Sequence, residues 1–133
     1  MPTVLFLCVA NSARSQMAEG LARTLAPPGY RFLSAGSEPG TLHPLAVAVM
    51  KEQGIDISHQ RAKGLAAIPL GDVDTIVTLC AEEVCPVVPG SVRLLHWALL
   101  DPARATGTDP ERLAAFRGTR DALRDLLPSI WGG

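Results

Sequence analysis

An apolar run at Thr3–Leu7 leads directly into a loop of small residues, Cys8–Ala13, and then into a helical pattern that begins at Ser15. A nearly unbroken apolar run of this length is typical of a strand buried on both faces of a parallel sheet. Over Ser15–Leu25 the apolar residues recur at helical spacing. A buried strand, a tight loop and a helix form one βα unit, so this segment alone favours an α/β fold.

The same alternation continues along the chain. Further strands are predicted at 31–35, 73–79 and 92–95, and further helices at 44–53 and 64–68 and from Asp109 onwards. Asp109 is the expected cap of the last helix, with Pro110 in its first turn. We therefore predict one α/β domain over residues 1–133: a four-stranded parallel sheet with helices on both faces and a phosphate-binding loop after the first strand.

Composition excludes several classes of protein. Hydrophobic residues make up 47% of the 133 residues and charged residues 19%, which is typical of a soluble globular domain. The formal net charge of -1 shows no excess of basic residues of the kind that nucleic-acid binding requires. The apolar runs are too short to cross a membrane, and no signal peptide is expected. Three cysteines do not suit a structural disulfide framework, so we expect the reducing cytoplasm. We also expect a monomer, because nothing in the sequence demands more.

The loop after the first strand has the features of an oxyanion site with a nucleophile. Its backbone N–H groups, over Val9–Arg14, can converge on an anion, and the following helix adds its positive end. This oxyanion loop comprises Val9, Ala10, Asn11, Ser12, Ala13 and Arg14. The Arg14 guanidinium can clamp a tetrahedral oxyanion with its planar fork. Cys8 is the expected nucleophile, because helix N-termini and cations favour the thiolate.

Polar residues in and after the loop have two possible roles. Asn11 and Ser12 are expected to shape the loop through side-chain hydrogen bonds to backbone. Ser15 lies where a helix cap would be, so it either caps the helix or donates a hydrogen bond to the Cys8 thiolate.

Two further cysteines fall in one segment. Cys80 ends the third predicted strand, so it should reach the same sheet edge as Cys8, because the carboxyl ends of parallel strands share one edge. Cys85 follows five positions later. Zinc sites usually need four ligands and the three histidines are scattered, so no metal site is expected. A redox couple is the favoured interpretation, and two separate surface thiols are the alternative.

An acid is available near the loop. Asp101, directly before Pro102, follows the fourth predicted strand and can reach the same edge. A carboxylic acid there could protonate a departing oxygen. Aspartate before proline is also common in turns, and taken alone the residue favours the turn.

Taken together, these motifs resemble the thioredoxin-coupled arsenate reductases, which share the fold of the low-molecular-weight protein tyrosine phosphatases. The matching motifs are Cys8–Arg14, Ser15–Gly20, Ser34–Gly36, Thr78–Cys80, Cys85–Pro86, His96–Trp97 and Asp101–Pro102. The first and last are shared with the phosphatases, whereas Cys80 and Cys85 match the reductases.

The resemblance implies a relay that reduces arsenate to arsenite, with phosphate or sulfate as competing oxyanions. Cys8 attacks arsenic, Asp101 protonates the leaving oxygen, and Cys80 then attacks Cys8. Cys85 attacks Cys80 in turn, and thioredoxin reduces the Cys80–Cys85 disulfide. No bound cofactor is implied, since the electrons come from reduced thioredoxin. The segment from Cys80 to Pro89 would have to move.

The chain departs from the family pattern at two points. Its four-residue spacer between Cys80 and Cys85 is shorter than in the best-known members. Some members bind potassium with residues matching Asn11, Glu19 and Ser34 plus a carboxylate, and Lys63 stands at the carboxylate position here. We predict that the Lys63 ammonium replaces the cation and pairs with Glu19; the alternative is a solvated lysine.

Three alternatives stay open from the sequence. A phosphatase could use the same loop, nucleophile and acid, although Ala103 and Arg104 follow Asp101-Pro102 where the phosphatases carry tyrosines, and Tyr30 is the only tyrosine. Weak phosphatase activity could also accompany the reductase. A non-catalytic oxyanion or redox module would have no use for Asp101. The electron donor could be glutaredoxin or a small thiol.

Overall fold

Parallel strands and helices alternate along the chain, in a computed structural model that describes residues 2–81 and 92–132. The elements are β1 (Thr3–Cys8), α1 (Arg14–Leu25), β2 (Arg31–Gly36), α2 (Pro44–Lys51), η1 (Leu65–Ala67), η2 (Leu70–Asp72), β3 (Thr75–Cys80), β4 (Arg93–Leu99), η3 (Pro102–Arg104), α3 (Asp109–Leu126) and η4 (Leu127–Ile130). The elements labelled η are short 3-10 helices.

The sheet places β1 between β2 and β3. Its strand order is β2-β1-β3-β4, and all three pairings are parallel. All six residues of β1 are buried, which explains its unbroken apolar pattern. Leu7 lies opposite Ala35 of β2 and Thr78 of β3. The register therefore brings the ends of β1 and β3, and with them Cys8 and Cys80, to one edge of the sheet.

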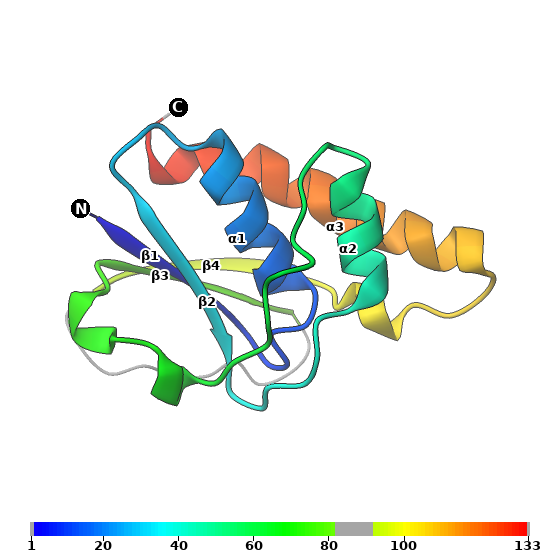
Figure 1. Ribbon diagram of the computed structural model, residues 1–133, viewed down its shortest axis with the longest axis horizontal. Coiled ribbons are helices and arrows are strands. Elements are labelled where there is room, and N and C mark those ends of the chain that lie inside the picture. The colour runs from blue at the N-terminus through cyan, green and yellow to red at the C-terminus, as the bar shows by residue number, and fades with distance from the viewer. Residues whose placement is uncertain (1, 82–91, 133) are drawn as a thin grey trace.

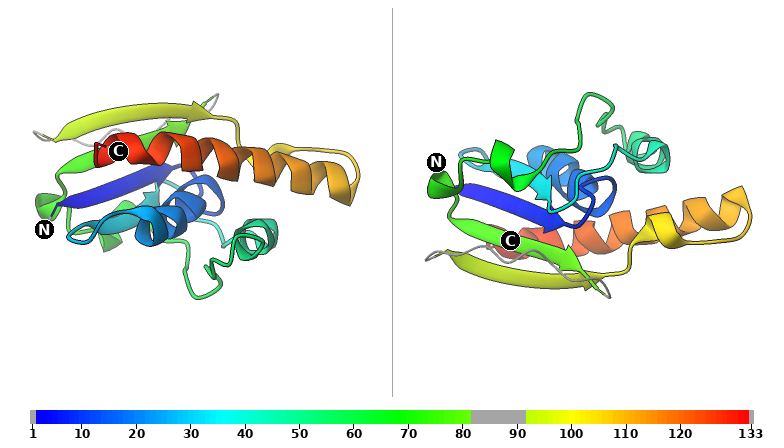
Figure 2. Two further views of the ribbon diagram at one scale, coloured as in Figure 1. Left: turned by 90° about the horizontal axis from the view of Figure 1, so that it is seen from above. Right: turned by 90° about the horizontal axis from the view of Figure 1, so that it is seen from below.

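The two faces of the sheet are covered unequally. Figures 1 and 2 show α1, α2 and α3 on one side of the sheet, and the larger apolar core lies there, around Phe6, Met17 and Phe116. The smaller core around Leu5, Leu7 and Ile76 is on the opposite face, beside η1. The predicted α/β architecture with helices on both faces is confirmed: in the described residues the three α-helices cover one face, and the 3-10 helices η1 and η2 lie on the other.

Most element boundaries differ from the sequence prediction by one or two residues, and two differences have a clear physical reason. Thr108, and not Asp109, caps α3: its hydroxyl accepts from Glu111 N, while the Glu111 carboxylate accepts from Thr108 N. This reciprocal capping box satisfies two backbone donors, whereas Asp109 could satisfy only one. Strand β4 runs to Leu99, four residues beyond the predicted end, because its alternating exposure is typical of an edge strand with one covered face.

Helix α2 is fixed to α3 at its carboxyl end. The buried Arg120 guanidinium donates to Val49 O at 2.8 Å and to Glu52 Oε1 at 2.7 Å. Hydrogen bonds from Arg117 and Arg120 lower the pKa of the exposed Glu52 carboxyl to about 2. The carboxyl end of α2 is therefore held in place on α3.

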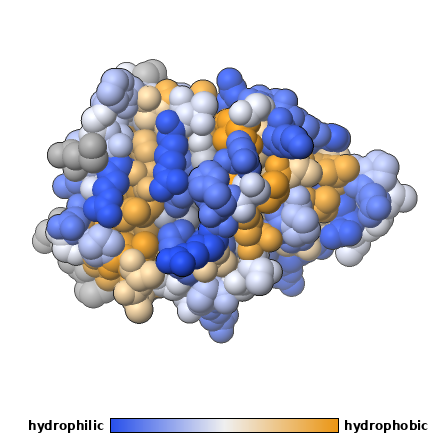
Figure 3. All heavy atoms as spheres, in the orientation of Figure 1, coloured by the Kyte–Doolittle hydropathy of each residue, from blue (hydrophilic) through white to orange (hydrophobic). Residues whose placement is uncertain are grey.

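The surface of the α-helical side is mixed. Figure 3 shows hydrophilic side chains over most of this face, broken by apolar patches, one of them beside α2. None of the helices in the described ranges has the length and apolarity needed to span a membrane.

Gly36, at the end of β2, is in close contact with the oxyanion loop. A Cβ there would clash with the carbonyl oxygen of Val9 and lie 2.8 Å from Asn11 N. We expect Gly36→Ala to lower the free energy of unfolding by about 2 kcal/mol, since backbone atoms must move to admit the methyl group. Urea unfolding measures this change.

Gly118 provides the matched control, because it lies within α3 and a Cβ there would meet nothing within 4 Å. Gly118→Ala should raise the free energy of unfolding by about 1 kcal/mol, the usual difference between the two residues in a helix. Equal effects of the two substitutions would contradict the close-contact argument.

Candidate active site

A short segment, Glu38–His43, holds the oxyanion loop from outside, and we call it the strap. Glu38 N donates to Val9 O, Gly40 N to Ala10 O and His43 N to Ser12 O, each at 2.9 Å. Because the N–H and C=O of a peptide unit point in opposite directions, holding these carbonyls outward turns the corresponding N–H groups of the loop inward. The strap thereby prepares the loop to receive an anion.

Asn11 completes this arrangement from within the loop. Its φ of 50° lies in the left-handed region, which asparagine tolerates better than most residues. Its carbonyl oxygen accepts from Gln16 Nε2 at 3.0 Å, so four successive carbonyls, from Val9 to Ser12, are held by groups outside the loop. The backbone N–H of Asn11 points into the loop, opposite to these carbonyls, and donates to Cys8 Sγ at 3.2 Å.

The Cys8 thiol is buried and has a hydroxyl beside it. Cys8 is a free cysteine that is only 2% exposed, and its Sγ lies 2.9 Å from Ser15 Oγ. Helix α1 begins at Arg14 after Ala13, with no side-chain cap. Ser15 therefore does not cap the helix; of its two predicted roles, the geometry favours the contact with the nucleophile.

The hydrogen bonds around Asn11 fix which way the protons point. Asn11 Oδ1 is 3.0 Å from the backbone N of Lys63, and a backbone N–H can only donate. The amide oxygen therefore faces Lys63, and Nδ2 donates to Ser15 Oγ at 2.7 Å. With its oxygen accepting that bond, the Ser15 hydroxyl has its own proton available for Cys8 Sγ.

Two glutamines extend this chain of donors outward. Gln16 Nε2 donates to Asn11 Oδ1 at 3.0 Å and to Arg61 O at 2.8 Å. Gln60 Nε2 in turn donates to Gln16 Oε1 at 2.7 Å. Each donor is thus oriented towards Asn11, Ser15 and finally the sulfur. The last donor of the chain, the Ser15 hydroxyl, is therefore directed at Cys8 Sγ.

Arg14 lies between the loop and the acid. Its side chain is 3% exposed, and Nη1 donates to Leu99 O at 3.0 Å and Leu79 O at 3.4 Å. Its Nη2 lies 3.8 Å from Asp101 Oδ2. Asp101 also caps η3, because its Oδ1 accepts from Ala103 N at 3.0 Å. The guanidinium and the carboxyl group are thus held side by side near the ends of β3 and β4.

Cys80, the second cysteine of the chain, is buried at the end of a strand. Cys80 ends β3, is 1% exposed and is disulfide-bonded. Cys85 lies outside the described residues. In the described parts of the chain, no three residues among histidine, cysteine, aspartate and glutamate gather where they could hold a metal ion.

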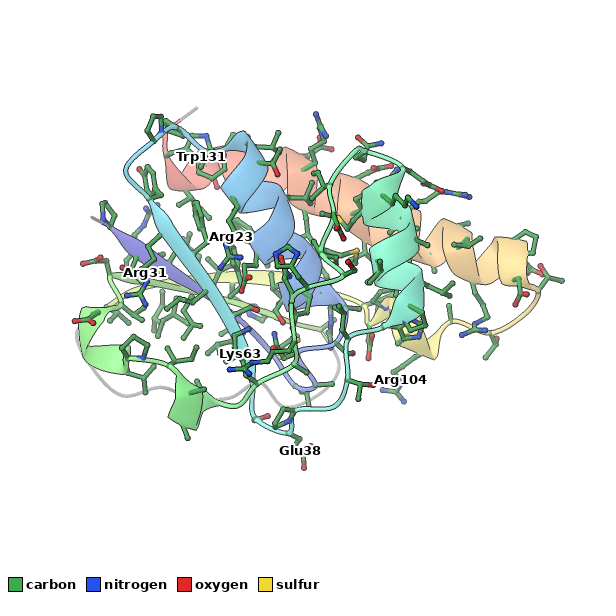
Figure 4. The ribbon with its side chains drawn as sticks, in the orientation of Figure 1. Arg23, Arg31, Glu38, Lys63, Arg104 and Trp131 are labelled. Carbon is green, nitrogen blue, oxygen red and sulfur yellow. The ribbon has the colours of Figure 1, made fainter. Side chains whose placement is uncertain are left out.

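A buried carboxylate, Glu19, lies behind the loop with two cations. Glu19 is 3% exposed, and it pairs with Arg23 at 3.0 Å and with Lys63 Nζ at 3.7 Å. Ser34 Oγ donates to Glu19 Oε1 at 2.8 Å. In Figure 4 Arg23 lies on α1 and Lys63 near the carboxyl end of β2. Lys63 Nζ also donates to Ser34 Oγ and Arg61 O, both at 3.3 Å.

Lys63 is held at this place by its backbone as well as by its ammonium. Its N–H donates to Asn11 Oδ1, and its carbonyl accepts from Gly36 N at 2.9 Å. Burial lowers the pKa of Lys63, and the nearby Glu19 carboxylate partly offsets this effect. The ammonium therefore lies against Glu19 and Ser34, while the backbone of Lys63 contacts the loop at Asn11.

Three contributors to this site were not predicted from the sequence. They are Gln16, Gln60 and the strap, which ends at His43. The strap acts through backbone groups, which no side-chain pattern reveals. Gln16 is a polar residue within an apolar helical segment, and this is the signal that could have indicated its role. Gln60 lies in a loop, is only partly buried and carries no such signal. Figure 4 shows Glu38, on the strap, and Arg104, on η3, at one edge of the molecule.

Comparison with known proteins adds independent evidence. Residues 3–129 match the family described as low molecular weight phosphotyrosine protein phosphatase. An arsenate reductase of Bacillus subtilis (strain 168) is 44% identical over 126 residues, covering 93% of this chain and 91% of the relative.

Two solved structures extend the comparison. One described as an arsenate reductase in the phosphate binding state has a TM-score of 0.84 and 34% identity, covering 99% of this chain and 98% of that chain. A thioredoxin-dependent arsenate reductase of Corynebacterium glutamicum has a TM-score of 0.72 and 31% identity, covering 98% of this chain and 62% of that chain.

The donor chain predicts the reactivity of Cys8. In Ser15→Ala the sulfur loses its hydroxyl donor, so alkylation of Cys8 by iodoacetamide at neutral pH should slow about tenfold, as a hydrogen bond to a charged group contributes about 1.5 kcal/mol. Ser129→Ala is the control, because Ser129 Oγ donates only to Leu126 O on the exposed surface. Unchanged alkylation in Ser15→Ala would show that Ser15 does not stabilise the thiolate.

Proposed function

The chain belongs to the low molecular weight phosphotyrosine protein phosphatase family, and we propose that within it the protein is an arsenate reductase with a Cys8–Cys80–Cys85 relay regenerated by thioredoxin. The observation that carries the proposal is the position of two cysteines on neighbouring strands. Cys8 ends β1 directly before the oxyanion loop, and Cys80 ends the adjacent β3. The relatives described as arsenate reductases support the reaction.

The loop and its neighbours account for the first step. The inward N–H groups and the Arg14 guanidinium hold the arsenate oxygens, and the Cys8 thiolate attacks arsenic. Ser15 supports the thiolate before attack, at 2.9 Å. Asp101, close to Arg14, gives its proton to the oxygen that leaves as water. The product of this step is a covalent bond between Cys8 sulfur and arsenic(V).

The second step transfers the electrons. The Cys80 thiolate attacks Cys8 sulfur, the sulfur–arsenic bond breaks, and its electron pair stays with arsenic, which leaves as arsenite. Cys85 then attacks Cys80, releasing Cys8 and forming a Cys80–Cys85 disulfide. Thioredoxin supplies the two electrons that reduce this disulfide. A free Cys8 together with a disulfide-bonded Cys80 is the combination that this last stage requires.

Strand geometry supports the second step and sets a condition on it. With Leu7 opposite Thr78, Cys80 is one residue and one strand from Cys8, a Cα separation of roughly 6 Å, within disulfide range. Side chains alternate along a strand, so Cys80 starts on the face opposite to Cys8. Cys80 must therefore turn for the sulfurs to meet, and the end of β3 has to rearrange.

The phosphatase alternative has less support from the rim of the site. Ala103 and Arg104 follow Asp101 and Pro102 on η3. Tyr30 stacks on Phe32, with ring centroids 5.8 Å apart, and contacts Trp131 at 6.2 Å, before the start of β2. The single tyrosine is thus at the end of the sheet opposite to Cys8. A weak phosphatase side activity is compatible with the loop and belongs to the same proposal.

The relay predicts the effect of Cys80→Ser. Arsenate-dependent consumption of NADPH with thioredoxin and thioredoxin reductase should be lost, because the Cys8–arsenic adduct cannot be resolved. Binding of inorganic phosphate should stay within about twofold, since serine keeps the size of the side chain. Full turnover by Cys80→Ser would rule out the relay, and a retained arsenate-dependent rate without thioredoxin would assign a different donor.

Thiol mapping after one turnover without reductant tests the order of transfer. We expect Cys80 joined to Cys85 and Cys8 alkylatable. Cys8→Ser, treated in the same way, should form no disulfide in response to arsenate. A Cys8–Cys80 disulfide as the final species would show that Cys85 does not complete the relay.

The Lys63 ammonium predicts indifference to potassium. We propose that it fills the place of a cation beside Glu19 and Ser34, so arsenate turnover should be equal in sodium and potassium buffers. In Lys63→Asp the ammonium is replaced by a carboxylate, and stimulation by potassium should appear. Clear potassium stimulation of the unaltered protein would contradict this proposal.

A further inference from the structure

His43 connects the oxyanion loop to α2 and α3 by three kinds of contact. Its backbone N–H donates to Ser12 O at 2.9 Å, as the last hydrogen bond of the strap. Its Nδ1 accepts from Leu45 N at 3.1 Å and caps α2. Its ring lies over Phe116 of α3, with centroids 4.7 Å apart. His43 thus contacts the loop through its backbone, and the start of α2 and the core through its side chain.

Only the neutral imidazole can make this cap. Nδ1 accepts a hydrogen bond from a backbone N–H, so in the capped state the ring proton is on Nε2. Protonation would turn Nδ1 into a donor facing another donor, and it would place a positive charge at the positive end of α2. The cap and the imidazolium are therefore mutually exclusive.

The surroundings also favour the neutral form. Burial lowers the pKa of His43, and Arg112 on α3 lowers it further, while Asp101, before η3, acts in the opposite direction. The net direction is downward from the ordinary value of 6.5. The cap is complete above that pH and is lost as the pH falls through the lowered pKa of His43.

We propose that His43 is a positioning residue for the oxyanion loop: its neutral imidazole caps α2 and so aims its backbone N–H at Ser12 O. Protonation releases the cap, frees the backbone of His43 and weakens oxyanion binding. The far end of α2 is anchored by Arg120, so the change is confined to the end that touches the loop. The inference rests on the proposed function only in requiring that the loop binds a tetrahedral oxyanion.

Inorganic phosphate is a suitable probe, and its dissociation constant is measured from pH 7.5 to pH 5 in three proteins. His43→Asn keeps a capping side chain that does not titrate, and His43→Ala removes the cap. At pH 7.5 the unaltered protein and His43→Asn should bind alike, within about twofold. Once the pH has fallen below the pKa of His43, the unaltered protein should bind about fivefold more weakly than His43→Asn, the size expected for one lost cap.

The ratio of the two constants isolates His43, because protonation of phosphate affects both proteins equally. His43→Ala should bind about fivefold more weakly than His43→Asn at every pH, since it has no cap to lose. A purely structural role would change the melting temperature and leave the ratio independent of pH.

The outcomes separate this inference from the proposed function. If the profiles of the unaltered protein and His43→Asn superimpose while both bind phosphate, the role of His43 is overturned and the oxyanion site stands. If the unaltered protein fails to bind phosphate at pH 7.5, both are overturned.

Discussion

The outward orientation of four successive carbonyls, from Val9 to Ser12, is the constraint on which the rest of the site depends. A loop of small residues has many conformations, and fixing them is costly in entropy. Here the strap and Gln16 hold the carbonyls, and the left-handed Asn11 completes the turn. The inward N–H groups, the orientation of Asn11 and the position of Cys8 all follow from that arrangement.

The local parts of the site could be predicted from the sequence, whereas the parts brought together by the fold could not. The nucleophile, the loop and Arg14 lie on one contiguous βα segment, so their proximity follows from strand and helix patterns. The parallel sheet and the shared edge of Cys8 and Cys80 follow from the alternation of elements. The strap contacts the loop, and Gln60 contacts Gln16, across long sequence separations and through backbone and amide groups, which periodicity does not reveal.

Buried charge is concentrated where the loop needs support. Arg14 and Glu19 are each about as buried as the apolar core, and isolated charges there would be strongly unfavourable. Each has partners: Arg14 has two backbone carbonyls and lies near Asp101, and Glu19 has Arg23, Lys63 and Ser34. Lys63 connects Glu19 to the oxyanion loop, because its backbone N–H donates to Asn11 while its ammonium pairs with Glu19.

The donor chain behind Ser15 consists of side-chain amides, from Asn11 through Gln16 to Gln60. Amides neither gain nor lose protons in the range where living cells operate. Acidification or alkalinisation of the surroundings consequently leaves the hydrogen-bonded support of the sulfur unaltered, whereas an imidazole in the same chain would have made the nucleophile a sensor of acidity. The hydrogen bonds that lead to the sulfur are in this respect independent of pH.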